Sequence, residues 1–209
     1  MQISEAYSEW SETYDSDRNL TRDLDHAVAK KYLTGRRFKR GLEIGCGTGK
    51  NTAVLASVAE RVVALDFSAG MIAKAKAKHS LSNVDFQITD ITQEWPCANA
   101  SFDLISGNLV LEHVEDLSHI FGEASRVLMP GGEFFVCELH PYRQYQGTQA
   151  RFDRAQGTTM IPAFVHHIAD FTNAAAANGL SVLALNEWWH QEDQGKPPRL
   201  VSFVFTKSA

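Results

Sequence analysis

An apolar strand that runs directly into a glycine-rich turn is the feature that most constrains this chain. The turn follows Leu42 and contains Gly45, Gly47 and Gly49, and glycine lets the backbone approach a ligand closely because it has no Cβ. A second apolar stretch ends in Asp66, about 20 residues after the first glycine, where a carboxylate can accept hydrogen bonds from both hydroxyls of a ribose. Together the two stretches predict a nucleoside site.

The glycine spacing disagrees with two common nucleotide motifs. A dinucleotide fingerprint needs glycine at the third position after Gly47, and Lys50 stands there. A phosphate loop needs glycine at the position of Ile44 and serine or threonine at the position of Asn51. Glu43 adds a carboxylate beside the turn, which would repel a pyrophosphate and attract a cation. We therefore expect a positively charged ligand.

Residues 43–49 together with Asp66 resemble motif I and the acidic residue that follows it in the class I S-adenosylmethionine (SAM)-dependent methyltransferases. SAM carries a sulfonium and an ammonium, which fits the acidic turn. By pattern the chain is similar to the small ubiquinone/menaquinone and malonyl-carrier-protein O-methyltransferases. Later segments continue the resemblance in the family's order: 86–91 resembles the adenine-contacting segment, 101–108 the fourth strand, 111–114 the start of the next helix, and 126–133 the turn into the fifth strand.

The resemblance implies which residues bind SAM. Phe67 and Met71 follow the ribose acid and can cover the adenine ring, and Asp90 can accept a hydrogen bond from the exocyclic amine, although Asp90 could instead cap a turn. Asn108 is expected beside the methionine portion. The predicted cofactor-binding residues are Tyr14, Glu43, Gly45, Cys46, Gly47, Gly49, Asp66, Phe67, Met71, Asp90, Ile91, Asn108 and Leu109.

The composition favours one enzyme domain without a nucleic-acid or membrane partner. The chain has 209 residues and a net charge of −5, which suits a single domain and gives no basic face for DNA or RNA; the basic cluster 36–40 is expected to be a solvated linker. Three cysteines without metal-ligand spacing predict no metal site and suit a reducing cytoplasm. No apolar run approaches the ~18 residues that span a bilayer, and residues 1–11 do not resemble a signal peptide.

Apolar strands alternate with amphipathic helices, which predicts an α/β fold with a doubly wound, mainly parallel sheet. A helix is expected over Asp116–Met129 with Asp116 as its N-cap, and another over Asn19–Leu33. The resemblance implies a Rossmann-like methyltransferase fold of seven strands in the order 3-2-1-4-5-7-6, with the last strand antiparallel. Strands are predicted near 41–45, 61–66, 84–88, 102–107, 133–139, 181–187 and 200–206.

Two segments outside the common core are expected to bind the methyl acceptor within this single domain of residues 1–209. The first is an N-terminal helical lid, 1–38, in which Tyr7 and Tyr14 either close the site or only pack a helix. The second is the insert 140–167. The SAM-binding core would span 40–139, and a helix and strands in 168–209 would complete the domain.

The insert follows the fifth strand, whose carboxyl end faces the reaction centre in parallel-sheet enzymes, and so long a loop is usually functional. His140, Tyr142 and His166 are the predicted catalytic residues because they could contact the nucleophile or take its proton. Either histidine could instead cap a helix or lie at the surface. His113, at the end of the fourth strand, lies where the resembling enzymes place residues that border the methyl group; a structural role in its turn is the favoured alternative.

The sequence favours SAM-dependent methyl transfer to a small-molecule acceptor, either anionic or bearing a carboxylate or hydroxyl group. Arg143, Arg151 and Arg154 motivate the anionic choice, although arginines in loops are often only solvated. Because the sulfonium methyl is already activated, the protein chiefly supplies alignment, plus a base where the acceptor is a hydroxyl or a protonated amine. The methylated atom and the oligomeric state stay open. The alternatives are an RNA or protein methyltransferase and a non-catalytic SAM-binding module.

Overall fold

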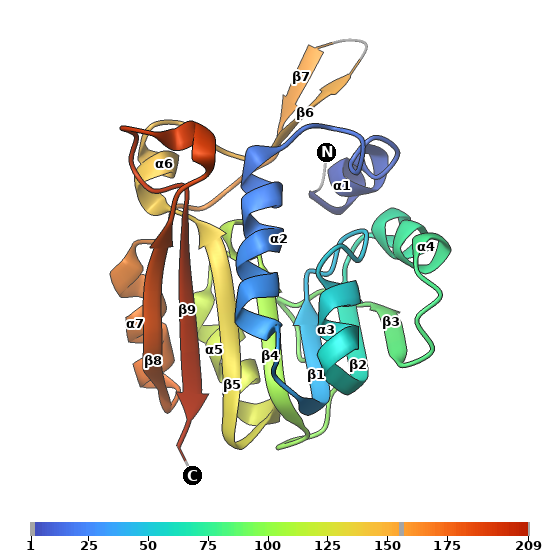
Figure 1. Ribbon diagram of the computed structural model, residues 1–209, viewed down its shortest axis with the longest axis vertical. Coiled ribbons are helices and arrows are strands. Elements are labelled where there is room, and N and C mark those ends of the chain that lie inside the picture. Colours follow the sequence, from blue (N-terminus) through green and yellow to red (C-terminus); the bar gives the residue numbers. More distant parts are fainter. Residues whose placement is uncertain (1–2, 155–156, 209) are drawn as a thin grey trace.

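The computed structural model describes residues 3–154 and 157–208 and contains a seven-stranded sheet (Figure 1). The strand order is β3-β2-β1-β4-β5-β9-β8, and all strands are parallel except β9, which runs antiparallel to both neighbours. The doubly wound, mainly parallel fold with an antiparallel last strand is confirmed. The strands are β1 (Phe38–Ile44), β2 (Ala59–Asp66), β3 (Val84–Ile88), β4 (Phe102–Asn108), β5 (Leu128–Leu139), β8 (Leu180–Trp188) and β9 (Leu200–Lys207).

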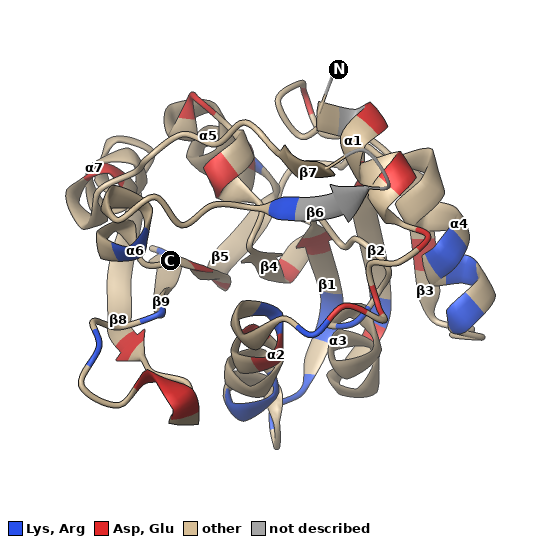
Figure 2. Ribbon diagram, turned by 90° about the horizontal axis from the view of Figure 1, so that it is seen from above, with Lys and Arg blue, Asp and Glu red and all other residues tan. Residues whose placement is uncertain are grey.

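Helices cover both faces of the sheet (Figure 2). One face is covered by α2 (Leu20–Leu33), α3 (Thr52–Val58) and α4 (Ala69–Lys78), and the other by α5 (Leu117–Val127) and α7 (Ile168–Ala177). Successive residues of a strand point to opposite faces, so Phe134 of β5 packs with Phe121 and Phe205 on the α5 side, whereas Phe135 stacks on Tyr32 of α2 at 4.4 Å. Burial on both faces explains the apolar run 134–137 of β5.

Polar side chains fix the starts of the helices. Asp116 accepts a hydrogen bond from the Ser118 amide at 2.9 Å and caps α5 as predicted, and Asn19 caps α2 by accepting from the amides of Thr21 and Arg22. Such a cap satisfies amides that have no partner inside the helix. The predicted helix 116–129 ends early, at Val127, because β5 begins at Leu128 and not near 133.

The segments outside the core differ from their expected form. Within the expected lid 1–38, only α1 (Ile3–Trp10) and the loop after it lie over the carboxyl ends of the strands, whereas α2 packs against β5 and α3 as part of the sheet's helical layer. The insert folds into α6 (Pro141–Tyr145) and a projecting hairpin, β6 (Arg151–Arg154) and β7 (Gly157–Met160). The basic cluster 36–40 is not the expected linker, because residues 38–40 belong to β1 and Arg36 pairs with Glu133 at 2.8 Å.

Candidate functional site

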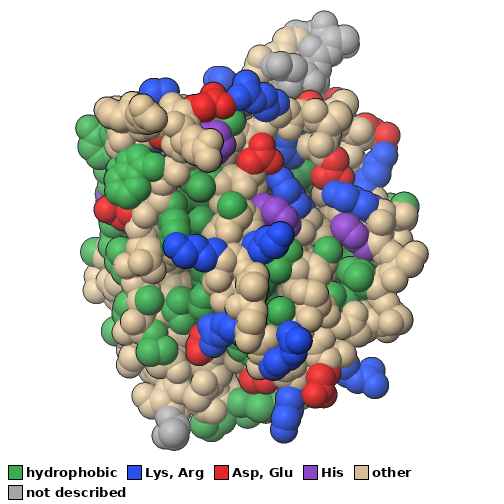
Figure 3. Space-filling model, in the orientation of Figure 1, with side chains coloured by type: hydrophobic (Ala, Val, Ile, Leu, Met, Phe, Trp, Pro, Cys, Tyr) green, Lys and Arg blue, Asp and Glu red, His purple; other side chains and the backbone are tan. Residues whose placement is uncertain are grey.

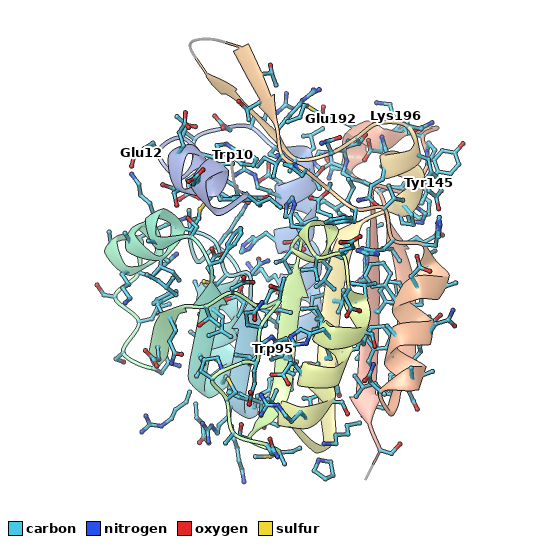
Figure 4. All side chains as sticks on the ribbon, turned by 180° about the vertical axis from the view of Figure 1, so that it is seen from behind. Trp10, Glu12, Trp95, Tyr145, Glu192 and Lys196 are labelled. Carbon is cyan, nitrogen blue, oxygen red and sulfur yellow. The ribbon has the colours of Figure 1, made fainter. Side chains whose placement is uncertain are left out.

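The larger of two neighbouring cavities, about 270 Å³, lies at the carboxyl ends of β1, β2 and β4 beneath the N-terminal segment. This edge of a parallel sheet is where open α/β proteins bind ligands. Figure 4 shows Trp10 of the N-terminal segment at this end of the sheet and Trp95 beside its body. All the predicted cofactor residues except Gly49 line the larger cavity, joined by Ile3, Tyr7, Arg22, Asp25, Thr48, Lys50, Asn51, Thr89, Thr92, Val110, His113 and Val114.

The glycine turn forms the floor of the larger cavity. Gly45 and Gly47 have positive φ angles of +68° and +54°, which glycine adopts at little cost. A Cβ on Gly45 would lie 2.4 Å from Val110 Cγ2, whereas a Cβ on Gly47 would meet nothing within 4 Å. Gly49 lies beyond the cavity wall, where its amide donates to the Cys46 carbonyl at 3.0 Å and closes the turn.

Asp66 connects this turn to the end of β2. One carboxylate oxygen accepts from the Gly47 amide at 2.8 Å, and the other accepts from the Ser68 amide at 2.9 Å. Each carboxylate oxygen can accept more than one hydrogen bond, so both retain capacity for a ligand hydroxyl. This geometry agrees with the predicted ribose contact, which stays a prediction.

Three buried carboxylates, Asp25, Glu43 and Asp66, line the larger cavity. Burial raises the pKa of Glu43 to about 8 and that of Asp66 to about 6, and it also raises the pKa of Asp25. Asn51 and Asn108 donate to Asp25 at 2.8 and 2.6 Å. Like charges held this close in a poorly solvated site favour either protonation or a bound cation.

Phe67, Met71, Asp90 and Ile91 form one end of the larger cavity, as expected for an adenine pocket. Asp90 is exposed, and its Oδ1 accepts from both the amide and the hydroxyl of Thr92 at 2.9 and 2.7 Å. Asp90 therefore caps a turn, as the alternative prediction had it, and it also lines the cavity. Both roles can coexist because a carboxylate has two oxygens.

The N-terminal segment closes over the glycine turn through specific contacts. Thr48 donates to Asp15 at 2.8 Å, and Ser8 and Ser68 share a hydrogen bond of 2.9 Å. Arg22 lies 4.0 Å from the ring centre of Tyr14 and donates to the Tyr14 carbonyl. Tyr14 is thereby fixed in the cavity wall, as a closing residue should be.

Tyr7 and His113 form a hydrogen-bonded pair in the same wall. His113 Nδ1 lies 2.9 Å from the Pro162 carbonyl, which can only accept, so this nitrogen carries the proton. The Tyr7 hydroxyl then donates to His113 Nε2 at 2.6 Å. Burial lowers the pKa of His113 and raises that of Tyr7, so the pair is held neutral near pH 7.

A smaller cavity of about 70 Å³ adjoins the larger one and shares the wall residues Tyr7, Tyr14, Arg22 and Leu109 with it. Leu109 has a φ angle of +52°, a strained conformation of the kind that collects at functional sites. The other residues lining the smaller cavity are Trp10, Asn19, Thr21, Glu112, Leu139, Thr148, Gln149 and Ala150.

The three predicted catalytic residues do not line either cavity. His140 caps α6 by accepting from the Tyr142 amide, and it donates to Glu187 at 2.9 Å. Tyr142 is 47% exposed, and His166 donates to the Val114 carbonyl at 2.7 Å. That His140, Tyr142 or His166 contacts the nucleophile stays a prediction, and their positions outside both cavities do not support it.

The described arginine side chains of the insert either pair with other residues or are exposed to solvent. Arg143 pairs with the buried Asp193 at 3.0 Å and donates to the Pro197 carbonyl. Arg151 is exposed, and the Arg154 side chain lies outside the described residues. No sequence motif marked Asp25, Arg22 or Glu112 as site residues, because periodicity places a residue on a helix or turn but does not show which cavity it faces.

Within residues 3–154 and 157–208, no group of three or more His, Cys, Asp or Glu side chains could hold a metal ion. The helices of this described part include none that is long and apolar enough to cross a membrane.

Known proteins resemble the chain over its core and over its whole length. A family model described as a methyltransferase domain matches residues 42–136. An uncharacterized methyltransferase of Emericella nidulans is 27% identical over 87% of this chain and 77% of its own. The malonyl-[acyl-carrier protein] O-methyltransferase of Erwinia billingiae is 34% identical over 66% of this chain, which spans only about half (53%) of that relative.

A solved structure of DhpI in complex with SAH (S-adenosyl-L-homocysteine, the product that SAM leaves after methyl transfer) has the same fold. Its TM-score is 0.75 at 24% identity, over 98% of this chain and 95% of that one. That likeness shows the fold, and the sequence matches over residues 42–136 and to the curated relatives identify a SAM-dependent methyltransferase domain. Its residues fit that cofactor, because the buried carboxylates of the larger cavity complement a ligand that carries a sulfonium and an ammonium.

SAM affinity should rise with pH. Glu43 and Asp66 have raised pKa values of about 8 and 6, and a bound cation favours their charged forms, so binding should release protons. Between pH 6 and 8 we expect an affinity gain of about three- to tenfold, since each released proton contributes up to about tenfold per pH unit. Calorimetry in two buffers of different ionisation enthalpy measures the protons released. Glu43→Gln should flatten the trend, and an affinity that falls with pH would contradict it.

Asp90→Ala should weaken SAM binding by about three- to tenfold, the loss expected for one hydrogen bond at an exposed carboxylate. The variant should also lose the preference for SAM over its inosine analogue, which lacks the exocyclic amine. Thr92→Val is the matched control, because it removes a bond to Asp90 and leaves the carboxylate in place. Unchanged SAM affinity in Asp90→Ala would take Asp90 out of the adenine pocket.

Proposed function

We propose that the chain transfers the methyl group of SAM to an oxygen of a small-molecule acceptor. The observation that carries the proposal is the pair of adjoining cavities beneath one N-terminal segment. The larger cavity has the charge and position suited to the cofactor, and the smaller one leaves room for only a small group beside it. An acceptor held in this arrangement lies beneath the N-terminal segment, in a space that suits a metabolite better than a polymer.

SAM, when bound, supplies a methyl group that is already activated for displacement. Asp66 would hold the ribose, and Asp25 and Glu43 would balance the positive charge. Tyr7 and Tyr14 line both cavities, so they can align the acceptor beside the cofactor and exclude water from it. The chain's own contribution is alignment and the acceptance of one proton.

Oxygen is the favoured methylated atom because the relative of Erwinia billingiae is named an O-methyltransferase. An acceptor hydroxyl needs a base, whereas a carboxylate does not. The arginines that suggested an anionic acceptor are engaged elsewhere or exposed, and carboxylates line both cavities. We therefore favour a hydroxyl-bearing acceptor over an anionic one.

RNA and protein acceptors are less well supported. The net charge is −5, and on the face in Figure 3 the Lys and Arg side chains stand apart, with acidic and uncharged ones among them. Such a surface does not favour the backbone of a nucleic acid. A non-catalytic module is disfavoured by the open volume beside the cofactor residues.

We also place the protein in the cytoplasm, because Cys46, Cys97 and Cys137 are free thiols.

The proposal is tested by supplying SAM with an isotope-labelled methyl group to the purified protein, together with a metabolite extract, total RNA or total protein in separate reactions. We expect label in a small molecule, with the methyl carbon bonded to oxygen by NMR. Asp66→Ala, with its weakened SAM binding, should transfer less label at a SAM concentration below saturation, and a reaction without protein is the blank. Label in RNA or protein, or on nitrogen or carbon of a metabolite, would overturn the proposal, as would absence of transfer in all three reactions.

A further inference from the structure

Glu112 is a buried carboxylate that the cofactor site does not use. Its side chain is only 8% exposed, it lines the smaller cavity, and its Oε2 has no hydrogen-bond partner among the described residues. The other oxygen, Oε1, lies 3.8 Å from His113 Nε2. A buried carboxylate oxygen without a partner is costly unless a ligand donates to it.

Arg22 presents the complementary group. Its terminal nitrogens donate to the carbonyls of Tyr14 and Asp17, but its buried Nε has no hydrogen-bond partner among the described residues. Arg22 also lines the smaller cavity. The smaller cavity is thus lined by one residue with an unsatisfied acceptor, Glu112 Oε2, and one with an unsatisfied donor, Arg22 Nε. This pair suits a ligand group that both donates and accepts a hydrogen bond. A hydroxyl group does both, whereas a carboxylate would oppose Glu112.

The walls of the smaller cavity suit an organic ligand. Trp10 packs against Tyr7 and Tyr14, with ring centres 5.7 and 4.7 Å away. Aromatic faces of this kind bind the apolar body of a ligand while polar groups fix its orientation. Tyr7 and Leu109 also line the larger cavity, so a group held here lies next to the cofactor site.

His113 is the obvious alternative base, but its hydrogen bonds occupy both nitrogens. Nδ1 donates to the Pro162 carbonyl, and Nε2 accepts from the Tyr7 hydroxyl. His113 therefore positions Tyr7 and has no lone pair left for an acceptor while this pair is formed. Tyr7 cannot act as the base either, because burial raises its pKa and its hydroxyl stays protonated at neutral pH.

We propose that the smaller cavity receives the hydroxyl end of the acceptor, that Glu112 Oε2 takes the hydroxyl proton, and that Arg22 Nε donates to an acceptor oxygen. This inference rests on the proposed function and narrows its substrate class to alcohols and phenols. In the step, the acceptor O–H bond breaks and its proton passes to Glu112. The oxygen forms a bond to the methyl carbon, and the sulfur–methyl bond breaks with its electron pair staying on sulfur.

The charge state of Glu112 agrees with this role. Burial raises the pKa of Glu112 to about 7, and a general base is most effective when its pKa lies near the working pH. The groups facing it are Glu138, whose own pKa Glu112 raises further, Tyr7, the neutral His113 and Gln144, whose side chain hydrogen-bonds the carboxyl and opposes the rise of its pKa. Arg22 lines the same cavity. Glu112 is therefore partly ionised at neutral pH.

A binding test needs no knowledge of the acceptor. The probes are 2-propanol, acetone and acetate, which have similar shapes but differ in donating and accepting capacity. They are titrated into SAH-saturated protein while NMR follows the carboxyl carbon of Glu112 in glutamate-labelled protein, assigned with Glu112→Gln. We expect a saturable shift with 2-propanol and much weaker effects of the other two. An acetate effect equal to that of 2-propanol, or no saturable effect of any probe, would overturn the inference.

A kinetic test uses a hydroxyl acceptor found in the labelled-SAM screen. Glu112→Gln should lower turnover by about 10²–10⁴-fold and abolish the rise of kcat/KM with pH near 7, without a change in SAH affinity. Glu112→Asp should retain part of the activity, which guards against misfolding as the cause. Glu115→Gln, an exposed carboxylate three residues away, should behave as wild type. Wild-type turnover in Glu112→Gln would contradict the inference but not the proposed function. A screen that finds no hydroxyl acceptor would contradict the proposed function but would not change the NMR result.

Discussion

Replacing Asp66 with alanine should weaken SAM binding by about ten- to a hundredfold. The carboxylate is buried and accepts from the amides of Gly47 and Ser68, so its loss removes the predicted ribose contact and leaves two amides without their acceptor. Hydrogen bonds to a charged group contribute about 1.5–3 kcal/mol, which corresponds to this range of affinity. Isothermal titration calorimetry with SAM and SAH measures the effect.

Two controls separate the ribose contact from general damage. Asp85→Ala removes an exposed carboxylate from the neighbouring strand β3 and should bind SAM as wild type does. Asp66→Asn keeps the size of the side chain and one acceptor oxygen, so its loss of affinity should be smaller than that of Asp66→Ala. If Asp66→Ala binds SAM with wild-type affinity, Asp66 does not belong to the site.

The sheet could be predicted largely because its central strands, unlike the partly exposed edge strands β3 and β8, are buried on both faces. Such strands appear in sequence as apolar runs bounded by turns, and β3 coincides with its predicted range while the other strands overlap theirs. The strand order came from the family resemblance, since periodicity does not determine it. The hairpin β6–β7 was missed because its sequence lacks the alternating apolar residues that mark a half-buried strand.

The candidate site was predictable only where a local motif determines it. The glycine turn and Asp66 belong to one strand–turn–helix unit and the end of the adjacent strand, so their contact follows from local geometry. Glu112 and Arg22 come from a turn and a helix far apart in sequence, and only tertiary packing brings them to one wall. His140 suggested catalysis by its position after β5, but its hydrogen bonds to Tyr142 and Glu187 make it a helix cap.

Gly45→Ala should be the most damaging single-methyl change in the glycine turn. The new Cβ would lie 2.4 Å from Val110 Cγ2 at a φ angle of +68°. The left-handed conformation costs a non-glycine residue about 1–2 kcal/mol, and overpacking adds about 1–3 kcal/mol. We expect an unfolding free energy lower by about 2–5 kcal/mol and a loss of SAM affinity, because relief of the overlap must shift the turn or Val110, and both line the larger cavity.

Thermal unfolding and calorimetry of three further variants separate the two causes. Gly131→Ala has a comparable φ angle of +76° and no neighbour within 4 Å, so it should show the conformational cost alone and leave SAM affinity unchanged. Val110→Gly removes the overlapping atoms, and the double variant with Gly45→Ala should be more stable than the sum of the single effects predicts. If the two changes in unfolding free energy are strictly additive, the Val110 side chain moves aside at no cost. The loss of stability in Gly45→Ala would then come from backbone strain alone.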